Sequence, residues 1–78
     1  MIVLFKFRLK ALRQDSDLTQ NELAKILNIS RTTISGYENA GTEPSFEILN
    51  KIADYFNVSI DYLLGRTSIS TPYPKKHK

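Results

Sequence analysis

Hydrophobic residues recur along most of the chain at the three- and four-residue spacing that is typical of amphipathic helices. Phe5, Leu9 and Leu12 indicate a first helix, and a broader apolar stripe indicates another at residues 46–56. Outside residues 2–7, no stretch has a convincing strand pattern. The spacing predicts five helices, at about residues 3–14, 20–27, 31–39, 46–56 and 60–64.

The predicted helix starts share one local pattern. Thr19, Ser30 and Ser59 each follow an apolar residue and stand four positions before another one, and Pro44-Ser45 is a looser version. A hydroxyl at such a position caps the free N–H groups of the first turn. Glu22 stands three residues after Thr19 and completes the pattern of a capping box.

The predicted helix ends carry residues that enter the left-handed backbone region readily, namely Asn28, Asn57 and Gly65. Starts and stops together predict an all-α fold, a compact five-helix bundle at residues 1–66. Residues 67–78 contain two prolines, several hydroxyl residues and a lysine cluster. They are predicted to form a flexible basic tail.

Composition removes several classes of function. The chain has no cysteine and its one histidine is His77, which argues against thiol chemistry and against zinc sites of cysteine or histidine. No nucleophile stands with a base, and no acid pair is visible, so we predict no enzyme, no catalytic residue, no metal and no cofactor. No apolar run approaches the ~18 residues of a membrane span, and no signal peptide is recognisable. The protein is predicted to be cytoplasmic.

The net charge of +3 does not by itself indicate a nucleic-acid partner. Lys75, Lys76 and Lys78 account for all of it, because residues 1–66 carry eight basic and eight acidic side chains. The distribution is more informative, since residues 1–14 hold four basic groups and no acidic one. Charge is therefore compatible with DNA binding without demonstrating it.

The connection between the predicted helices 20–27 and 31–39 is about three residues long. So short a link forces a steep crossing, which is typical of a helix-turn-helix, and Ala24 is small where the helices would meet. A helical wheel places Tyr37 and Glu38 inside. The outer side and its flanks carry Arg31, Thr32, Thr33, Ser35, Gly36 and Asn39.

This outer face suits the major groove of DNA. Small side chains allow the helix to approach closely, arginine can donate two bonds to guanine, and threonine methyl groups can touch thymine. Gly36 costs about 0.5–1 kcal/mol inside a helix relative to alanine, which a closely approaching duplex would explain. A solvated polar face is the alternative for this helix alone, and the short turn and Ala24 favour DNA.

The residues 18–24, 29–35 and 37–39 resemble the Cro/repressor-type (XRE-type) helix-turn-helix family. Residues 44–45 and 58–65 are similar to the fourth and fifth helices of that family, so that the resemblance extends from about residue 5 to residue 65. The resemblance implies a lambda-repressor-like DNA-binding domain. It also implies roles for individual residues at positions that match the family pattern.

The implied base-reading residues are Arg31, Thr32, Thr33, Ser35 and Gly36. The implied phosphate contacts are Lys10, Thr19, Gln20, Asn39 and Ser45, with Gln20 also bracing the base-reading helix. Capping is at least as good a role for Thr19 and Ser45, and a solvated surface lysine is the alternative for Lys10. The resemblance further implies a structural ion pair between Arg13 and the inward-facing Glu38.

The chain departs from the family pattern at several positions. Asp17 stands where the family commonly has glycine, and residues 40–43 lack its usual basic residues. Fewer loop cations predict modest affinity for DNA. They also predict a shallow salt dependence, because the logarithm of the binding constant falls by about 0.9 per neutralised phosphate for each tenfold rise in salt concentration. Phe7 and Ile26 are apolar where the pattern is often polar, which predicts either an association surface or a gap-filling role in the core.

Two functions follow from these patterns. The first is a sequence-specific regulator of transcription, most simply a repressor, that binds double-stranded DNA as a homodimer. Dimerisation onto a pseudo-palindromic operator, with half-sites about 34 Å apart, compensates for the few base pairs that one helix reads. The alternative is a protein-interaction module, similar to an antitoxin, whose main partner is another protein. Selection of a DNA sequence by the isolated chain distinguishes them.

Overall fold

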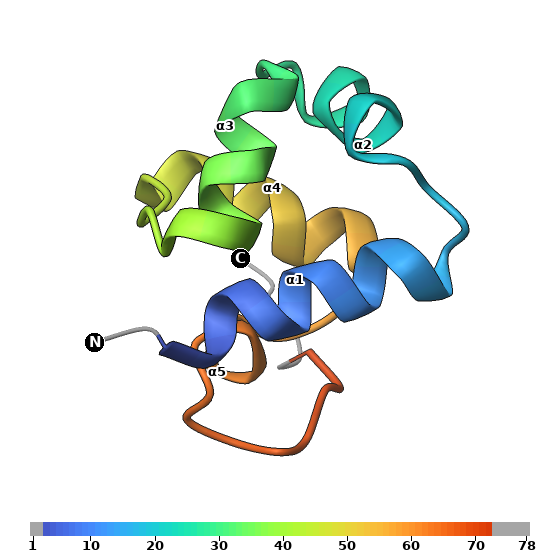
Figure 1. Cartoon of the computed structure of the whole chain (residues 1–78). Helices are drawn as coiled ribbons and strands as arrows, with labels where there is room; N and C mark the ends of the chain where they lie inside the picture. The colour runs from blue at the N-terminus through green and yellow to red at the C-terminus, as the bar shows by residue number, and fades with distance from the viewer. Residues whose placement is uncertain (1–2, 73–78) are drawn as a thin grey trace.

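The computed structural model of the protein describes residues 3–72, which form α1 (Val3–Asp15), α2 (Gln20–Leu27), α3 (Arg31–Ser35), α4 (Phe46–Phe56) and α5 (Ile60–Leu63). A π-helical turn, η1 (Gly36–Ala40), continues α3 without a break. This part of the chain contains no strand, and none of its helices is long and apolar enough to cross a bilayer. In Figure 1, α1 crosses in front of α4, with α2 and α3 above it and α5 below.

The all-α prediction is confirmed, and the five predicted ranges agree with the helical segments to within one residue at each end. The kind of helix differs at one place. The last turn of the predicted helix 31–39 is π-helical rather than α-helical. No local pattern in the sequence indicated this turn.

The four predicted caps, at the starts of α2, α3, α4 and α5, are present. Thr19, Ser30, Ser45 and Ser59 each accept a hydrogen bond from the backbone N–H three residues later. At Thr19 the capping box is complete, because its own N–H donates to Glu22 Oε1 at 2.8 Å. These bonds satisfy N–H groups that have no partner within the helix.

The predicted left-handed positions are also present, with φ angles of 59° at Asn28, 56° at Asn57 and 79° at Gly65. Asp17, in the turn between α1 and α2, has φ 58° as well. Aspartate tolerates this region better than most residues. The departure from the family pattern at Asp17 therefore preserves the backbone conformation for which glycine is suited.

The core is formed by apolar side chains from every α-helix, and its largest fully buried members are Phe5, Leu9, Leu23, Leu27, Ile34, Ile52 and Leu63. Tyr37 of η1 packs edge to face on Phe5, with ring centroids 5.9 Å apart. Burial raises the pKa of the Tyr37 hydroxyl, so the ring enters the core as a neutral phenol. This contact fixes α1 against the end of the α3–η1 run.

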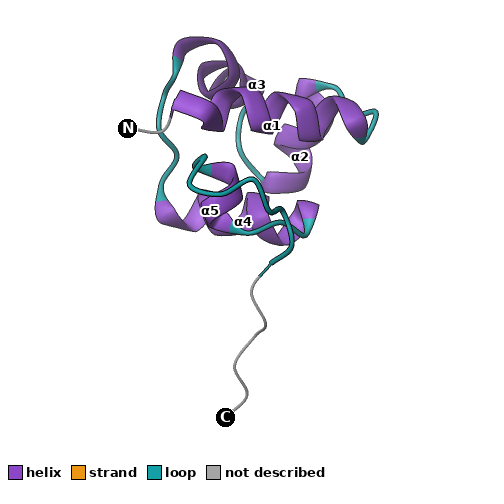
Figure 2. Cartoon of the chain, turned by 90° about the horizontal axis from the view of Figure 1, so that it is seen from below, coloured by secondary structure: helices purple, strands orange, loops and turns teal. Residues whose placement is uncertain are grey.

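Residues 67–70, the first part of the predicted tail, are hydrogen-bonded to the domain. The guanidinium of Arg8 lies over the Tyr62 ring, 4.1 Å from Cζ to the centroid, and donates to the carbonyls of Tyr62 and Thr67. The N–H of Ser59 donates to the carbonyl of Ser70 at 2.9 Å. Figure 2 shows this segment running across α4 and α5. The lysines of the predicted tail lie outside the described residues.

We predict that residues 67–70 contribute to stability. A chain that ends after Arg66 lacks the Thr67 and Ser70 carbonyls, which leaves the N–H of the buried Ser59 without its acceptor. The free energy of unfolding should fall by about 1–3 kcal/mol, the usual penalty for such a group. Urea denaturation followed by circular dichroism measures the difference. A chain that ends after Thr71 is the control, and equal stability of the two chains would contradict the prediction.

Candidate nucleic-acid interface

Residues 28–30 form the tight turn between α2 and α3. The N–H of Asn28 donates to the carbonyls of Ala24 and Lys25, and the N–H of Ile29 donates to Ala24 at 2.9 Å. Ala24 is only 2% exposed. Figure 1 shows α3 leaving the turn at a steep angle to α2. The predicted helix-turn-helix arrangement is confirmed.

The α3–η1 run has the two faces that the helical wheel predicts. On the inner face Ile34, Tyr37 and Glu38 are buried, at 0%, 4% and 6% exposure. The candidate base-reading residues all lie on the solvent side. Their exposure differs: Arg31 and Thr32 are exposed, and Thr33, Ser35 and Gly36 are half-buried.

The candidate base-reading side chains also differ in their hydrogen bonds. Among the described residues, the side chains of Arg31 and Thr32 have no partner and are free to bind a ligand. Thr33 Oγ1 lies 2.8 Å from Ser30 Oγ, so its hydroxyl takes part in the cap of α3. Asn39 Nδ2 donates to Ser35 Oγ at 3.0 Å. This last bond was not predicted, although the four-residue spacing of serine and asparagine on a helix is a signal for it.

Gly36 lies close to Thr42. A Cβ atom at this position would lie 3.2 Å from Thr42 Oγ1, closer than most such contacts. The Gly36 carbonyl accepts hydrogen bonds from the N–H groups of Gly41 and Thr42, which closes the end of η1. The close approach of a duplex stays a prediction for this residue.

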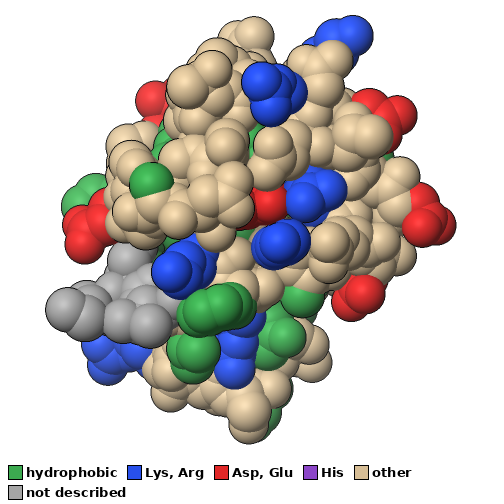
Figure 3. Space-filling model, viewed as in Figure 1, with side chains coloured by type: hydrophobic (Ala, Val, Ile, Leu, Met, Phe, Trp, Pro, Cys, Tyr) green, Lys and Arg blue, Asp and Glu red, His purple; other side chains and the backbone are tan. Residues whose placement is uncertain are grey.

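The candidate phosphate-contacting residues are distributed over several elements. Thr19 and Ser45 are exposed and cap their helices, so the structural role predicted for both is present. Lys10 is exposed on α1, where it has no ion-pair partner in the described part of the chain. Figure 3 shows Lys and Arg side chains gathered along the side of α1 that faces the α3–η1 run. Cations on this side add positive potential beside the polar face.

The predicted pair of Arg13 and Glu38 is present and buried. Arg13 Nε lies 2.7 Å from Glu38 Oε2 and Nη2 lies 2.9 Å from Oε1, a two-bond geometry that suits a guanidinium and a carboxylate. The Glu38 side chain is fully buried. The hydrogen bonds that Arg13 donates to Glu38 raise the pKa of Arg13 above its ordinary value; burial opposes this rise, and the negative charge of Glu38 adds to it.

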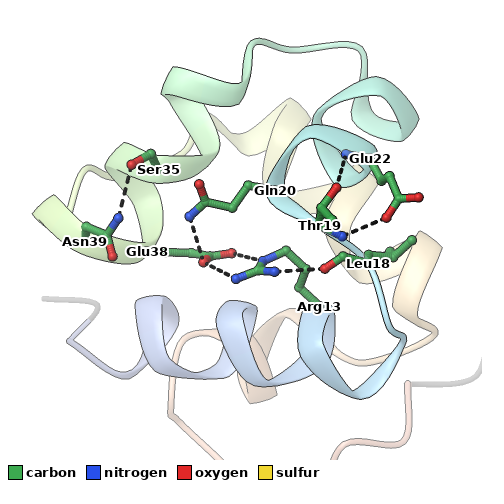
Figure 4. Close-up of polar contacts among 8 residues, drawn as sticks. All are labelled: Arg13, Leu18, Thr19, Gln20, Glu22, Ser35, Glu38 and Asn39. Atoms are coloured by element: carbon green, nitrogen blue, oxygen red, sulfur yellow. Dashed lines mark hydrogen bonds and ion pairs between the residues drawn. The ribbon is translucent and has the colours of Figure 1, made fainter.

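Two further contacts extend this pair into a network (Figure 4). Arg13 Nη1 donates to the carbonyl of Leu18 at 2.8 Å, and Gln20 Nε2 donates to Glu38 Oε1 at 3.2 Å. The network thereby connects α1, the turn before α2, the first residue of α2 and η1. Gln20 lies where it can brace the α3–η1 run, as the family resemblance implied. The contact with Leu18 could not be predicted from any motif.

Phe7 and Ile26, for which the sequence left two interpretations open, lie on the surface. Phe7 is 58% exposed and Ile26 is 44% exposed, so the gap-filling interpretation is wrong for both. The association surface stays a prediction. A different apolar site is a groove lined by Glu43, Pro44, Phe46, Leu49 and Leu64, which we call the α4–α5 groove. Phe46 at its edge is 86% exposed.

We predict that Arg13→Ala lowers stability far more than it changes base preference. The substitution leaves the buried Glu38 carboxylate unpaired, which costs about 3–5 kcal/mol. Thermal and chemical denaturation measure the loss. Arg66→Ala is the matched control, because it breaks the exposed pair with Asp61 at 3.7 Å and should cost less than about 1 kcal/mol. An unchanged melt for Arg13→Ala would refute a structural role.

Comparison with known proteins identifies a family model and relatives that this chain matches. A family model described as helix-turn-helix (HTH_3) matches residues 9–63. The chain is 43% identical over 63 residues to the HTH-type transcriptional regulator ImmR of Bacillus subtilis, covering 81% of this chain and 50% of that protein. It is 41% identical over 64 residues to the antitoxin PezA of Streptococcus pneumoniae, covering 82% of this chain and 40% of that protein.

Solved structures of helix-turn-helix repressor domains have the same fold as this chain. The P22 c2 repressor, solved in complex with a synthetic operator, superposes with a TM-score of 0.72 at 33% identity, covering 77% of this chain and 91% of that chain. The N-terminal DNA-binding domain of SinR from Bacillus subtilis superposes with a TM-score of 0.71 at 26% identity, covering 78% of this chain and 90% of that chain. The chain spans half or less of the length of the two curated relatives above.

Proposed function

This chain belongs to the Cro/repressor-type helix-turn-helix family, and on that premise we propose that it is a sequence-specific, double-stranded-DNA-binding regulator of transcription. The observation that carries the proposal is the solvent face of α3, where Arg31 and Thr32 present side chains without partners in the described structure. The tight turn and the Arg13–Glu38 network hold this face in place. The protein acts in the cytoplasm, without catalysis, and as a repressor like the P22 c2 protein.

The α3 helix enters the major groove with its outer face toward the base edges. Arg31, Thr32, Thr33, Ser35 and Gly36 lie on that face. Phosphate contacts come from the surrounding elements: Lys10, Thr19, Gln20, Asn39 and Ser45. The exposed caps support this assignment, because a helix start offers backbone N–H groups to an anion. Few loop cations follow η1, so affinity is modest and falls slowly with salt.

Arg31→Ala should weaken binding to the preferred site by about 1–3 kcal/mol and blur one position of that site. In vitro selection from a random duplex library identifies the site, and fluorescence anisotropy measures affinity for it and for random DNA. Arg66→Ala removes the same charge from the chain segment after α5 and is the control. Equal losses on selected and random DNA would reassign Arg31 to a phosphate contact.

A homodimer is the form that binds DNA, because one helix reads only a few base pairs. Two copies on a pseudo-palindromic site place their α3 helices about 34 Å apart, in successive major grooves. The α4–α5 groove supports this arrangement as the contact surface. It presents an apolar face with the highly exposed Phe46 at its edge, and such a face is favourable to cover.

Phe46→Ser should shift the protein from dimer toward monomer in sedimentation velocity and reduce cooperative binding to the two-fold site, because it removes the most exposed apolar contact of the groove. Phe7→Ser is the matched control, since it removes a second exposed phenyl ring, on α1. Dissociation by Phe7→Ser and not by Phe46→Ser would place the interface on α1 instead.

The second candidate is an antitoxin-like module whose principal partner is another protein. The similarity to the antitoxin PezA and the exposed Phe7 and Ile26 favour it. The two functions are compatible in one protein. The selection experiment separates a DNA-reading regulator from a module whose only specific partner is a protein, because such a module enriches no two-fold site.

A further inference from the structure

Lys6 and Lys10 project from one face of α1, and we call them the α1 lysine pair. Because they are four residues apart, their Cβ atoms are neighbours on the helix surface, about 5–6 Å apart. Arg13 follows Lys6 by seven residues, close to two full turns, so it projects from nearly the same face. Arg13 is bonded to the buried Glu38 of η1. The face of α1 that carries the lysine pair therefore borders η1.

The first half of α1 also lies against η1, so Lys6 is close to the end of the α3–η1 run. The ring of Phe5, its neighbour in the chain, packs on Tyr37 with the ring centroids 5.9 Å apart. Asn39, two residues after Tyr37, is exposed at the end of this run. Figure 3 shows cationic side chains gathered on the side of α1 that faces the run. The α1 lysine pair thus lies at the border of the face that is proposed to read bases.

Within the described structure, no carboxylate neutralises the α1 lysine pair. α1 contains no acidic residue before Asp15, and neither lysine forms an ion pair with another described residue. Like charges four residues apart repel one another and destabilise a helix. On α4, by contrast, Lys51 stands four residues after Glu47, with Nζ and Oε2 4.0 Å apart. The arrangement on α1 is unfavourable by itself, and an anion that binds to both lysines relieves the repulsion.

We propose that Lys6 joins Lys10 as a phosphate contact, so that the α1 lysine pair binds the DNA backbone beside the reading face. This inference rests on the proposed DNA-binding function, in which Lys10 alone has this role on α1. Each lysine carries a compact ammonium group on a flexible four-carbon stem, which binds a phosphate group as a point charge. Two such groups one helical turn apart can reach neighbouring phosphates of one strand.

The contact of Lys6 with Phe7 leaves its charge available to a ligand. The Lys6 ammonium group lies 5.2 Å from the centroid of the Phe7 ring, which is itself exposed. A ring at an exposed site attracts a cation weakly and does not cancel its charge. The other two cations of α1 are bound within the fold, since Arg13 pairs with Glu38 and Arg8 donates to backbone carbonyls. The α1 lysine pair is therefore the part of the α1 charge that can meet a phosphate.

Fluorescence anisotropy over a series of salt concentrations tests the inference with the wild type, Lys6→Gln, Lys10→Gln and the double variant. The slope of log K against log salt concentration should become shallower by about 0.9 for each single substitution and by about 1.8 for both, because each lysine neutralises one phosphate. Losses of affinity should be equal on selected and random DNA, and in vitro selection should return an unchanged base preference. Lys6→Arg keeps the charge and should keep the wild-type slope.

Lys51→Gln is the matched control, because it removes the same charge from α4, which Figure 1 shows behind α1. Its slope should equal that of the wild type. Duplexes with single uncharged methylphosphonates locate the contact. The replacement that the wild type loses through Lys6 should cause no further loss in Lys6→Gln, since the two groups act as one unit. The melting temperature of Lys6→Gln should not fall, because the substitution removes a repulsion and no core contact.

A slope for Lys6→Gln equal to that of the wild type would overturn the inference and leave the proposed function intact. A loss confined to selected DNA would overturn it too, because Lys6 would then contact a base. If the wild type enriches no sequence but the slopes on random DNA change as expected, sequence-specific regulation fails and the phosphate contact stands. A wild type that binds no DNA overturns both.

Discussion

The buried contact between Arg13 and Glu38 is the interaction on which the presentation of the polar face depends. A carboxylate that is fully buried is strongly unfavourable without a charged partner, so the fold must bring α1 and η1 together at Arg13 and Glu38. Arg13 also binds the Leu18 carbonyl, and Gln20 reaches the same Glu38. One ion pair thus sets the position of α1, the start of α2 and the end of the α3–η1 run.

The solvent face of the α3–η1 run carries both side chains without a hydrogen-bond partner and side chains that are hydrogen-bonded to a neighbour. Arg31 and Thr32 have no intramolecular partner in the described structure, whereas Thr33 and Ser35 already share hydrogen bonds with Ser30 and Asn39. Side chains held by neighbours have their geometry set before any ligand binds, whereas free side chains can adapt to a ligand. The face therefore unites an adaptable cation at the helix start with fixed hydroxyl groups farther along.

The basic residues of α1 show why a count of charges overstates the number of cationic side chains that are free to bind a ligand. Arg13 is neutralised by Glu38, and Arg8 stacks on Tyr62 and binds the carbonyls of Tyr62 and Thr67. Lys6 lies 5.2 Å from the Phe7 ring, and Lys10 is the one of these four α1 cations that has no partner among the described residues. Half of the cations of residues 1–14 thus stabilise the fold.

The sequence by itself determined the helices and their caps. Thr19 with Glu22, and the left-handed Asn28 and Asn57, act within three or four residues of themselves, so their effect is local and can be predicted. The Arg13–Glu38 pair became predictable only through the family resemblance, because 25 residues separate its members. The π-helical turn, the contact of Gly36 with Thr42 and the attachment of residues 67–70 through Arg8 were decided by the tertiary structure. Each depends on groups that only the folded chain brings together, and no local pattern specifies such distances.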